Sequence, residues 1–226
     1  MTTPAASERV GGIFALAGAA VLLATTLLHP ATADPSDAAV AFAEYAASDL
    51  WVAAHVGQLL GFALLGAALV ALAGTLPAGY GAALGRIGAA GAIAMIAVAA
   101  VLQAVDGVAL KVAVDRWAVA VGEARTRAFE AAFAVRQVEI ALAAVLSLLT
   151  GATLIAISAA VLAARRHPRW FGALGVIGAV GAIAAGYGYA VAGFSTGPML
   201  TSTIANVLLL AWAAAASTLM LTGTDT

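Results

Sequence analysis

Six polar side chains that could bind a ligand occur within long apolar stretches of the sequence. They form three pairs with a spacing of three residues, which are His55 and Gln58, Gln103 and Asp106, and Arg136 and Glu139. Residues three apart share one face of a helix. An ionisable side chain in a bilayer costs roughly 2.5–3.5 kcal/mol on insertion scales, so each one needs a partner or a function. We therefore predict that these six residues form one ligand-binding site.

Histidine and carboxylate side chains of the same region could also hold a metal ion. A zinc site needs at least three converging protein ligands, and the candidates are His29, His55, Asp106 and Glu139. No His-Glu-x-x-His spacing accompanies them. A haem held by His29 and His55 from facing helices is the redox alternative. The sequence thus leaves the identity of a metal or cofactor open.

Two further interpretations use the charged residues of this set. Asp106 and Arg136 could form a structural ion pair between adjacent helices, with Glu139 and His55 as neighbours. Alternatively, Asp106 or Glu139 could carry a proton across a membrane, with Arg136 adjusting its pKa. The opposite halves of the apolar stretches contain almost only Ala, Val, Leu, Ile and Gly. This disfavours a transporter, because transport needs access from both sides.

The elements that position these residues are predicted to be six membrane-spanning helices. The chain has 226 residues, of which 64% are hydrophobic and 9% are charged, whereas about a quarter of the residues of a soluble domain are charged. A helix that crosses the hydrocarbon needs about 20 mostly apolar residues. Six stretches qualify, at residues 10–28, 51–76, 87–110, 131–164, 171–192 and 203–221. We expect an all-α membrane bundle that forms a single domain over residues 1–226.

Composition excludes several classes of partner and chemistry. The net charge of −1 gives no basic field that would attract nucleic acid. The chain has no cysteine, which excludes disulfides, thiolate metal sites and cysteine nucleophiles. The abundance of Ala, Gly and Arg is typical of a GC-rich bacterial genome. The lipid bilayer is the partner that the composition predicts.

The first apolar stretch has a second interpretation. Arg9, the apolar run and then Ala31-Thr32-Ala33 resemble a secretory signal with a small-residue cleavage site. The apolar run is longer than the core of a usual signal, which favours a retained span. Cleavage would leave five spans in the same orientation.

The distribution of arginine predicts that both termini lie in the cytoplasm. Cytoplasmic loops are enriched in Lys and Arg, and with this orientation the inner segments carry Arg9, Arg86, Arg165, Arg166 and Arg169. The middle outer segment is an exception, with Lys111, Arg116, Arg125 and Arg127 interleaved with acidic residues. We interpret it as a helical hairpin at the interface. The site residues then lie in the outer half of a multi-pass protein of the plasma (cytoplasmic) membrane.

Two connecting segments have more than one interpretation. The acidic first outer loop, residues 30–50, could include a short amphipathic helix, although an ordinary solvated connector is favoured. The basic cluster of residues 165–170 is typical of a topology anchor with an interfacial aromatic residue. The same cluster could also contact anionic lipid headgroups.

An internal repeat predicts how the six helices pair. Residues 83–94 read ALGRIGAAGAIA and residues 173–184 read ALGVIGAVGAIA. Both copies begin a helix that would run from inside to outside, so we expect three consecutive hairpins. Glycines recur every third residue in both copies, and small residues allow helices to pack closely in lipid. Oligomers through such glycine-rich faces are also possible.

The sequence resembles a group of bacterial six-helix integral membrane proteins that form a domain-of-unknown-function family. The matching motifs are Arg9-Val10-Gly11, His55-Val56-Gly57 and the entry to the fifth span at residues 169–175. This resemblance covers nearly the whole chain and implies a six-helix fold. It implies no activity and no catalytic residue.

The polar side chains at one end of an apolar bundle lead to a functional prediction. We expect a non-enzymatic membrane protein whose outward-facing polar pocket binds a small ligand, lipid or ion, for sensing or as a subunit of an assembly. The first alternative is a membrane enzyme or redox protein that uses a metal or haem in the same pocket. The second alternative is a proton-coupled transporter.

Overall fold

The computed structural model describes residues 5–223, and within this range the chain is helical with no strand. Its elements are α1 (Ala6–Leu28), α2 (Ala38–Ala47), α3 (Trp51–Gly74), α4 (Tyr80–Ala104), a π-helix (Val105–Leu110), α5 (Lys111–Val119), α6 (Gly122–Ala164), α7 (Arg169–Ala192) and α8 (Thr196–Thr222). The predicted all-α class is confirmed.

Six of these helices are long and apolar enough to cross a membrane, as predicted. They are α1, α3, the continuous helix from Tyr80 to Val119, α6, α7 and α8. Large apolar side chains face outward along them, for example Leu27 at 76%, Ile87 at 63% and Val207 at 61% exposure. Water would not favour so much exposed apolar surface, whereas lipid does. The chain is therefore a multi-pass α-helical membrane protein.

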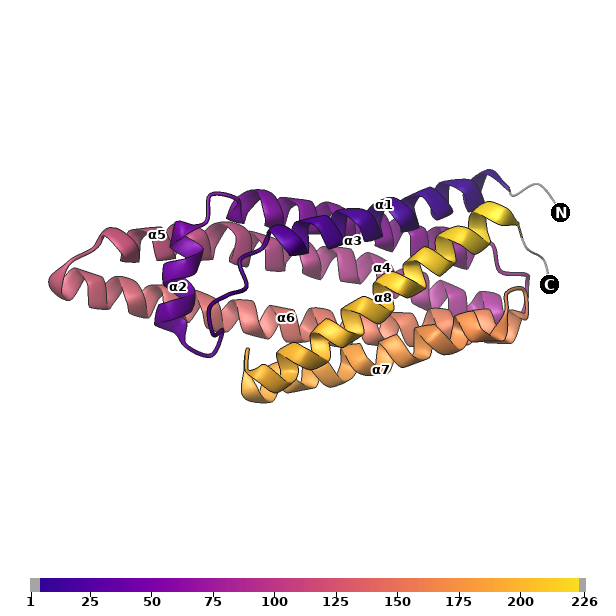
Figure 1. Cartoon of the computed structure of the whole chain (residues 1–226). Helices are drawn as coiled ribbons and strands as arrows, with labels where there is room; N and C mark the ends of the chain where they lie inside the picture. The colour runs from indigo at the N-terminus through magenta and orange to yellow at the C-terminus, as the bar shows by residue number, and fades with distance from the viewer. Residues whose placement is uncertain (1–4, 224–226) are drawn as a thin grey trace.

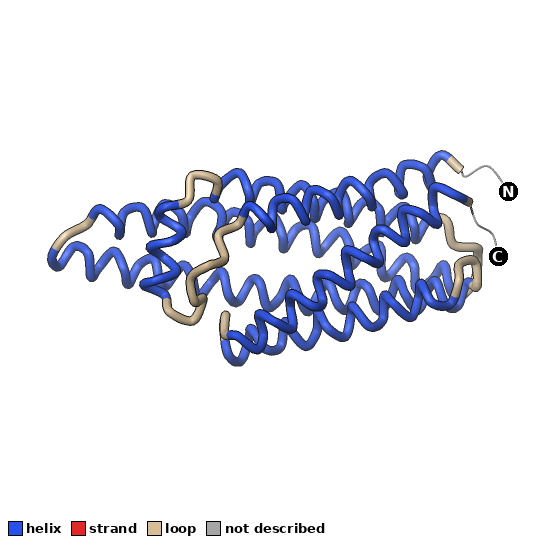
Figure 2. Tube along the Cα trace, viewed as in Figure 1, coloured by secondary structure: helices blue, strands red, loops and turns tan. Residues whose placement is uncertain are grey.

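The six long helices form a closed ring in chain order, with α8 returning to pack against α1. The pairs α1–α3, α4–α6 and α7–α8 are the three predicted hairpins (Figures 1 and 2). The beginning of α1 and the end of α8 lie at one end of the bundle, which we call the terminal end. The opposite end, with α2, α5 and the beginning of α6, is the distal end. The membrane orientation of the two ends stays a prediction.

Close helix contacts depend on glycine. A Cβ added to Gly88 of α4 would lie 2.5 Å from Ile157 of α6, and one added to Gly91 would lie 2.4 Å from Thr153. The corresponding glycines of the second copy, Gly178 and Gly181 of α7, face α8 with more space. These two glycines of each copy thus face the next span along the chain, which fits the hairpin arrangement.

Two long helices project well beyond the hydrocarbon. The helix from Tyr80 to Val119 has 40 residues and α6 has 43, so each is roughly 60 Å long at about 1.5 Å per residue. The hydrocarbon layer is about 30 Å thick. About half of each helix must therefore lie outside it, which agrees with the helical hairpin predicted around Lys111 and with the projecting fourth span.

The first connector differs from the favoured prediction, because it contains the helix α2. Asp37 caps this helix by accepting hydrogen bonds from the amides of Ala39 and Val40. Phe42 and Tyr45 on its inner face are buried. The connector is therefore a packed cover, held by its apolar face.

The buried side chains form two separate cores. The larger core lies among the spans and includes Leu72, Met95, Ile157 and Phe171. The smaller core lies at the distal end beneath α2, and it consists of Ala41, Phe42, Tyr45, Trp51, Leu110, Val114, Trp117 and Ala132. The site described below borders this distal core.

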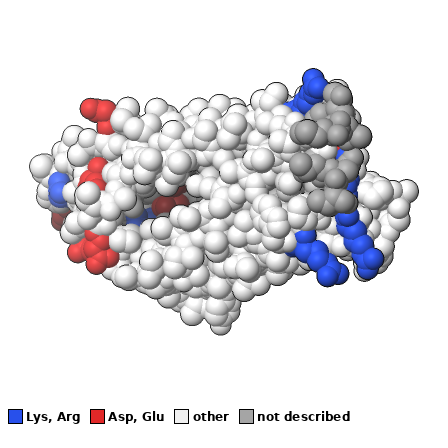
Figure 3. Space-filling model, turned by 45° about the vertical axis from the view of Figure 1, so that its right-hand side comes forward, with Lys and Arg blue, Asp and Glu red and all other residues white. Residues whose placement is uncertain are grey.

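Basic side chains gather at the terminal end and acidic ones at the distal end (Figure 3). Among the described residues the terminal end carries five arginines against one glutamate, Glu8. Glu8 is buried and forms an ion pair with Arg166, which also donates to the carbonyl of Thr75. This clamp joins the beginning of α1 and the end of α3 to the turn between α6 and α7.

Candidate metal centre

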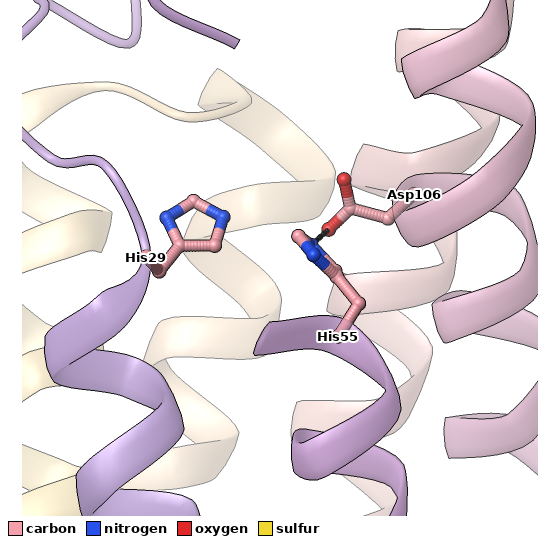
Figure 4. Close-up of side chains that lie close together, drawn as sticks. All are labelled: His29, His55 and Asp106. Carbon is pink, nitrogen blue, oxygen red and sulfur yellow. Dashed lines mark ion pairs between the residues drawn. The ribbon is translucent and has the colours of Figure 1, made fainter. Parts of the chain in front are cut away.

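Three predicted ligands converge at the boundary between the spans and the distal core. His29 follows the last residue of α1, His55 lies in the second turn of α3, and Asp106 lies in the π-helix after α4. One ligand atom from each lies within 4.8 Å of the other two. Figure 4 shows the His55 side chain beside the Asp106 carboxylate, with the His29 ring facing the pair. Three separate spans therefore contribute to one cluster.

Backbone carbonyls orient both imidazole rings in the same way. Nδ1 of His55 lies 2.6 Å from the carbonyl oxygen of Trp51, and Nδ1 of His29 lies 2.7 Å from that of Pro30. A carbonyl oxygen only accepts, so each Nδ1 carries a proton and donates it. The neutral ring then has its lone pair on Nε2. Histidine ligands of metal ions are commonly oriented by such a second-nitrogen hydrogen bond.

His55 and Asp106 form a buried pair. Nε2 of His55 lies 2.9 Å from Oδ2 of Asp106, and the side chains are 1% and 14% exposed. Nδ1 of His55 donates to Trp51, so the contact of Nε2 with Oδ2 is a hydrogen bond when Nε2 also carries a proton. A divalent ion that binds here takes the place of this proton.

His29 lies just beyond the end of its span and is suited to remain neutral. Burial lowers its pKa from the ordinary value, and the nearby His55 lowers it further, against a smaller opposing effect of Asp106. A neutral imidazole has an Nε2 lone pair that can bind a cation. Among the described residues, no protein group forms a hydrogen bond with this atom.

Aromatic packing holds the cluster from the side of the distal core. The Trp51 ring lies 4.5 Å from the His55 ring, 4.8 Å from the His29 ring and 4.3 Å from the Tyr45 ring, measured between centroids. Its Nε1 donates to the carbonyl oxygen of Asp106 at 3.0 Å. Trp51 therefore fixes the positions of all three ligands.

Glu44 of α2 holds the segment that follows His29. Its carboxylate accepts hydrogen bonds from the Thr32 amide and hydroxyl and from the Ala33 amide, at 2.9 and 3.1 Å for the two amides. Partial burial would raise the pKa of Glu44, but these hydrogen bonds lower it below the ordinary value. The carboxylate is thus ionised at neutral pH and keeps residues 29–33 in place.

The π-helix brings Asp106 towards His55. Single π-helical turns inside longer helices are frequent at functional sites. A Cβ added to Gly107, within this turn, would lie 2.5 Å from Cβ of His55. Glycine is therefore required for the close approach of α3 and the π-helix at the level of the candidate ligands.

The other four predicted site residues lie near the cluster but have different contacts. Gln103 donates to Gln58 at 3.2 Å, which joins α4 to α3. Arg136 is 2% exposed and donates to the Tyr45 hydroxyl at 3.0 Å and to the Pro35 carbonyl at 2.7 Å. Glu139 is 5% exposed, and its carboxyl group interacts electrostatically with Asp106 and Arg136. It lies outside the three-residue cluster of possible ligands.

The structural ion pair considered from the sequence has a different composition. Asp106 pairs with His55, and no ion pair joins it to Arg136 among the described residues. Arg136 instead lies against the rings of Phe42, Tyr45 and Phe194. The connector, which the sequence did not predict to be packed, supplies the groups that Arg136 binds.

Three residues important to the cluster were not predicted from the sequence. Trp51, Tyr45 and Glu44 orient ligands or hold the connector. For Trp51, the available signal was the spacing of four between Trp51 and His55, which places both on one helical face. For Tyr45, the amphipathic helix considered for residues 30–50 was a signal that one face of the connector could pack inward.

Two hollows on the surface lie away from this cluster. One is lined by Leu162, Arg165, His167, Pro168 and Arg169 at the terminal end. The other is lined by Ala43, Ala46, Ala47, Trp117, Ala118 and Arg125 on the distal surface.

Searches of protein-family models, curated proteins and solved structures find no match to this chain. The resemblance to the bacterial six-helix family stays a prediction from the sequence. The function must be inferred from the geometry of the site.

Proposed function

We propose that this membrane protein binds one divalent transition-metal ion through Nε2 of His29, Nε2 of His55 and the carboxylate of Asp106. The observation that carries the proposal is the common orientation of the two imidazoles. Both Nδ1 atoms lie at backbone carbonyls, which leaves the Nε2 atoms as the metal-binding nitrogens, and one ligand atom from each of the three residues lies within 4.8 Å of the other two. Two imidazoles and one carboxylate are a frequent ligand set of catalytic zinc and non-haem iron sites.

The spacing supports an ion of this class. Zinc–ligand bonds of about 2.0–2.1 Å in a tetrahedral site put ligand atoms about 3.4 Å apart. The present ligand atoms lie between 2.9 Å and 4.8 Å from one another, so small side-chain rotations are sufficient. Asp106 is 14% exposed, which leaves room for water at the fourth position.

Packing disfavours the haem alternative. A haem with two histidine ligands needs a flat slot between the two rings. Here the imidazole centroids of His29 and His55 are 5.1 Å apart, and the Trp51 ring packs against both. An organic ligand would meet the same restriction.

An ion pair without a metal is the simpler structural role of His55 and Asp106. It does not account for His29, which is directed at the pair and whose Nε2 forms no hydrogen bond with another described residue. His29 therefore separates the two interpretations. Its removal leaves the ion pair intact but takes one ligand from a metal site.

The predicted orientation indicates where the proposed site would lie in the membrane. With both termini in the cytoplasm, the site lies at the outer boundary of the plasma membrane. A metal-binding role in sensing or as a subunit of an assembly agrees with the function predicted from the sequence. The inner halves of the spans provide no charged pathway, which supports binding over proton transport.

The test is metal binding by the full-length chain in detergent after treatment with a chelator. We expect one equivalent of Zn²⁺ or Co²⁺ by calorimetry and elemental analysis, and d–d absorption of the Co²⁺ form typical of four-coordination. His29→Ala should weaken binding at least tenfold, because one of three protein ligands is lost. Gln58→Ala is the matched control, since it removes a nearby polar side chain outside the cluster.

Two outcomes would contradict the proposal. One is protein that takes up no stoichiometric divalent metal. The other is unchanged affinity in His29→Ala. A Soret absorbance band in the purified protein would instead support the haem alternative.

A further inference from the structure

The hollow at the terminal end has the composition of an anion site. It has a volume of about 310 Å³ and lies where α6 ends and α7 begins. Its lining combines the basic residues Arg165 and Arg169 with Leu162, Pro168 and His167. The metal site lies at the opposite end of the bundle, so the two features are independent.

The structure divides the basic cluster of residues 165–170 into two roles. Arg166 is engaged inside the protein, where it binds Glu8 and the Thr75 carbonyl. Arg165 and Arg169 are exposed, and neither guanidinium group binds another described residue. These two arginines are therefore available to a ligand.

The backbone at Arg165 supports a role for its side chain. Arg165 has a φ of 54°, and it is the non-glycine residue with positive φ in the described chain. Glycine is the usual residue at this position after a helix. An arginine here is less favourable for the backbone, which is expected where its guanidinium group is needed.

The location indicates the kind of anion. Trp170, adjacent to Arg169, is 54% exposed, and exposed tryptophan is typical of the membrane–water interface. The single described acidic residue at this end, Glu8, is already paired, so the field around the hollow is positive. Basic side chains at a membrane surface attract anionic lipids, and guanidinium groups bind phosphate through paired hydrogen bonds.

We propose that this hollow binds the phosphate of an anionic phospholipid, held between Arg165 and Arg169, with Leu162 and Pro168 against its apolar part. The lipid would lie at the junction of the second and third hairpins. Zwitterionic lipids carry a compensating positive group and would bind less well.

The experiment is native mass spectrometry of the full-length protein in detergent, titrated with phosphatidylglycerol or phosphatidylcholine. The wild type should bind phosphatidylglycerol at least fivefold more tightly. Loss of one surface charge weakens such binding about fivefold, so Arg165→Gly combined with Arg169→Gln should abolish the preference. The matched control removes two exposed charges at the distal end, with Arg116→Gln and Arg127→Gln, and should keep the preference.

Each remaining outcome overturns the proposal. Retained preference in the terminal-end variant would exclude the hollow, and an equal loss in the control would indicate general charge attraction only. Displacement of the lipid by millimolar inorganic phosphate would indicate a site for soluble phosphate.

Arg165→Gly alone should not lower the melting temperature, because glycine suits the backbone there. If the double variant fails to fold, Arg169→Gln alone should still weaken the lipid binding about fivefold.

Discussion

At the scale of single residues, Asp106 pairs with His55 and not with Arg136, the partner considered from the sequence. Its carboxylate lies 2.9 Å from His55, whereas Arg136 directs its hydrogen bonds to Tyr45 and Pro35. The difference matters energetically, because a buried charge that loses its partner is destabilising by more than the pair contributes. Asp106 and His55 should therefore behave as one energetic unit, and Arg136 should belong to the connector.

A double-mutant cycle tests this assignment. In metal-free protein, His55→Gln and Asp106→Asn should each lower the free energy of unfolding, and the double variant should lose about 1–3 kcal/mol less than the sum. Asp106→Asn combined with Arg136→Gln should be additive within about 0.5 kcal/mol. Denaturant unfolding in detergent measures both cycles. Additivity in the first cycle would contradict the pairing of His55 with Asp106. Coupling in the second cycle would indicate that Arg136 is the ionic partner of Asp106.

The predicted residues show which features of a site can be predicted from the spacing of residues in the sequence. The i, i+3 pairs drew attention to His55 and Asp106, and these two converge with His29 in the structure. Spacing gives no information on the rotation of one helix about another, which is why the partner of Arg136 could not be predicted. That partner comes from Tyr45 and Pro35 in the connector, and their inward position depends on tertiary packing.

At the scale of elements, the π-helix Val105–Leu110 determines where Asp106 lies relative to α3. One wider turn changes the helical phase of the following residues, and Gly107 allows His55 to pack directly against the backbone. The position of a π-turn is not visible in hydrophobic periodicity. The sequence therefore predicted an apolar span through residue 110 without the local change that brings the ligands together.

Gly107→Ala should disrupt the site through packing alone. The added Cβ would lie 2.5 Å from Cβ of His55, so α3 and the π-helix must separate. We expect a loss of about 1–3 kcal/mol in stability and at least tenfold weaker metal binding.

Gly74→Ala is the matched control, because nothing lies within 4 Å of the added Cβ at that helical position. It should be neutral or slightly stabilising by helix propensity. Equal effects of the two substitutions in unfolding and metal titrations would argue against a close contact at Gly107.

At the scale of the whole molecule, the six spans were predictable because hydrocarbon thickness imposes a minimum length of apolar sequence. The beginning of α6 was less predictable. Its first residues, from Gly122 onward, are mostly exposed and mixed in polarity, and such a segment is compatible with a helix or a loop. The same applies to α2, whose helical form depends on burial of Phe42 and Tyr45.

The charge asymmetry of the molecule predicts its orientation in the membrane. Segments rich in arginine are retained in the cytoplasm, so the terminal end, with five arginines and one paired glutamate, should face inward. The proposed metal site at the distal end would then be accessible from outside. Because the chain has no cysteine, single introduced cysteines can report on each end without background.

Ala78→Cys, in the exposed turn between α3 and α4, should react with a membrane-impermeant maleimide only after the cells are permeabilised. Val121→Cys, at the distal turn and 81% exposed in the native residue, should react in intact cells. The two positions lie in turns outside every span, so neither substitution should affect folding. The reverse labelling pattern would place both termini outside and the metal site in the cytoplasm. Metal supply to the proposed site would then come from the cytoplasmic pool, whereas the expected pattern means that the proposed site takes up metal from outside the cell.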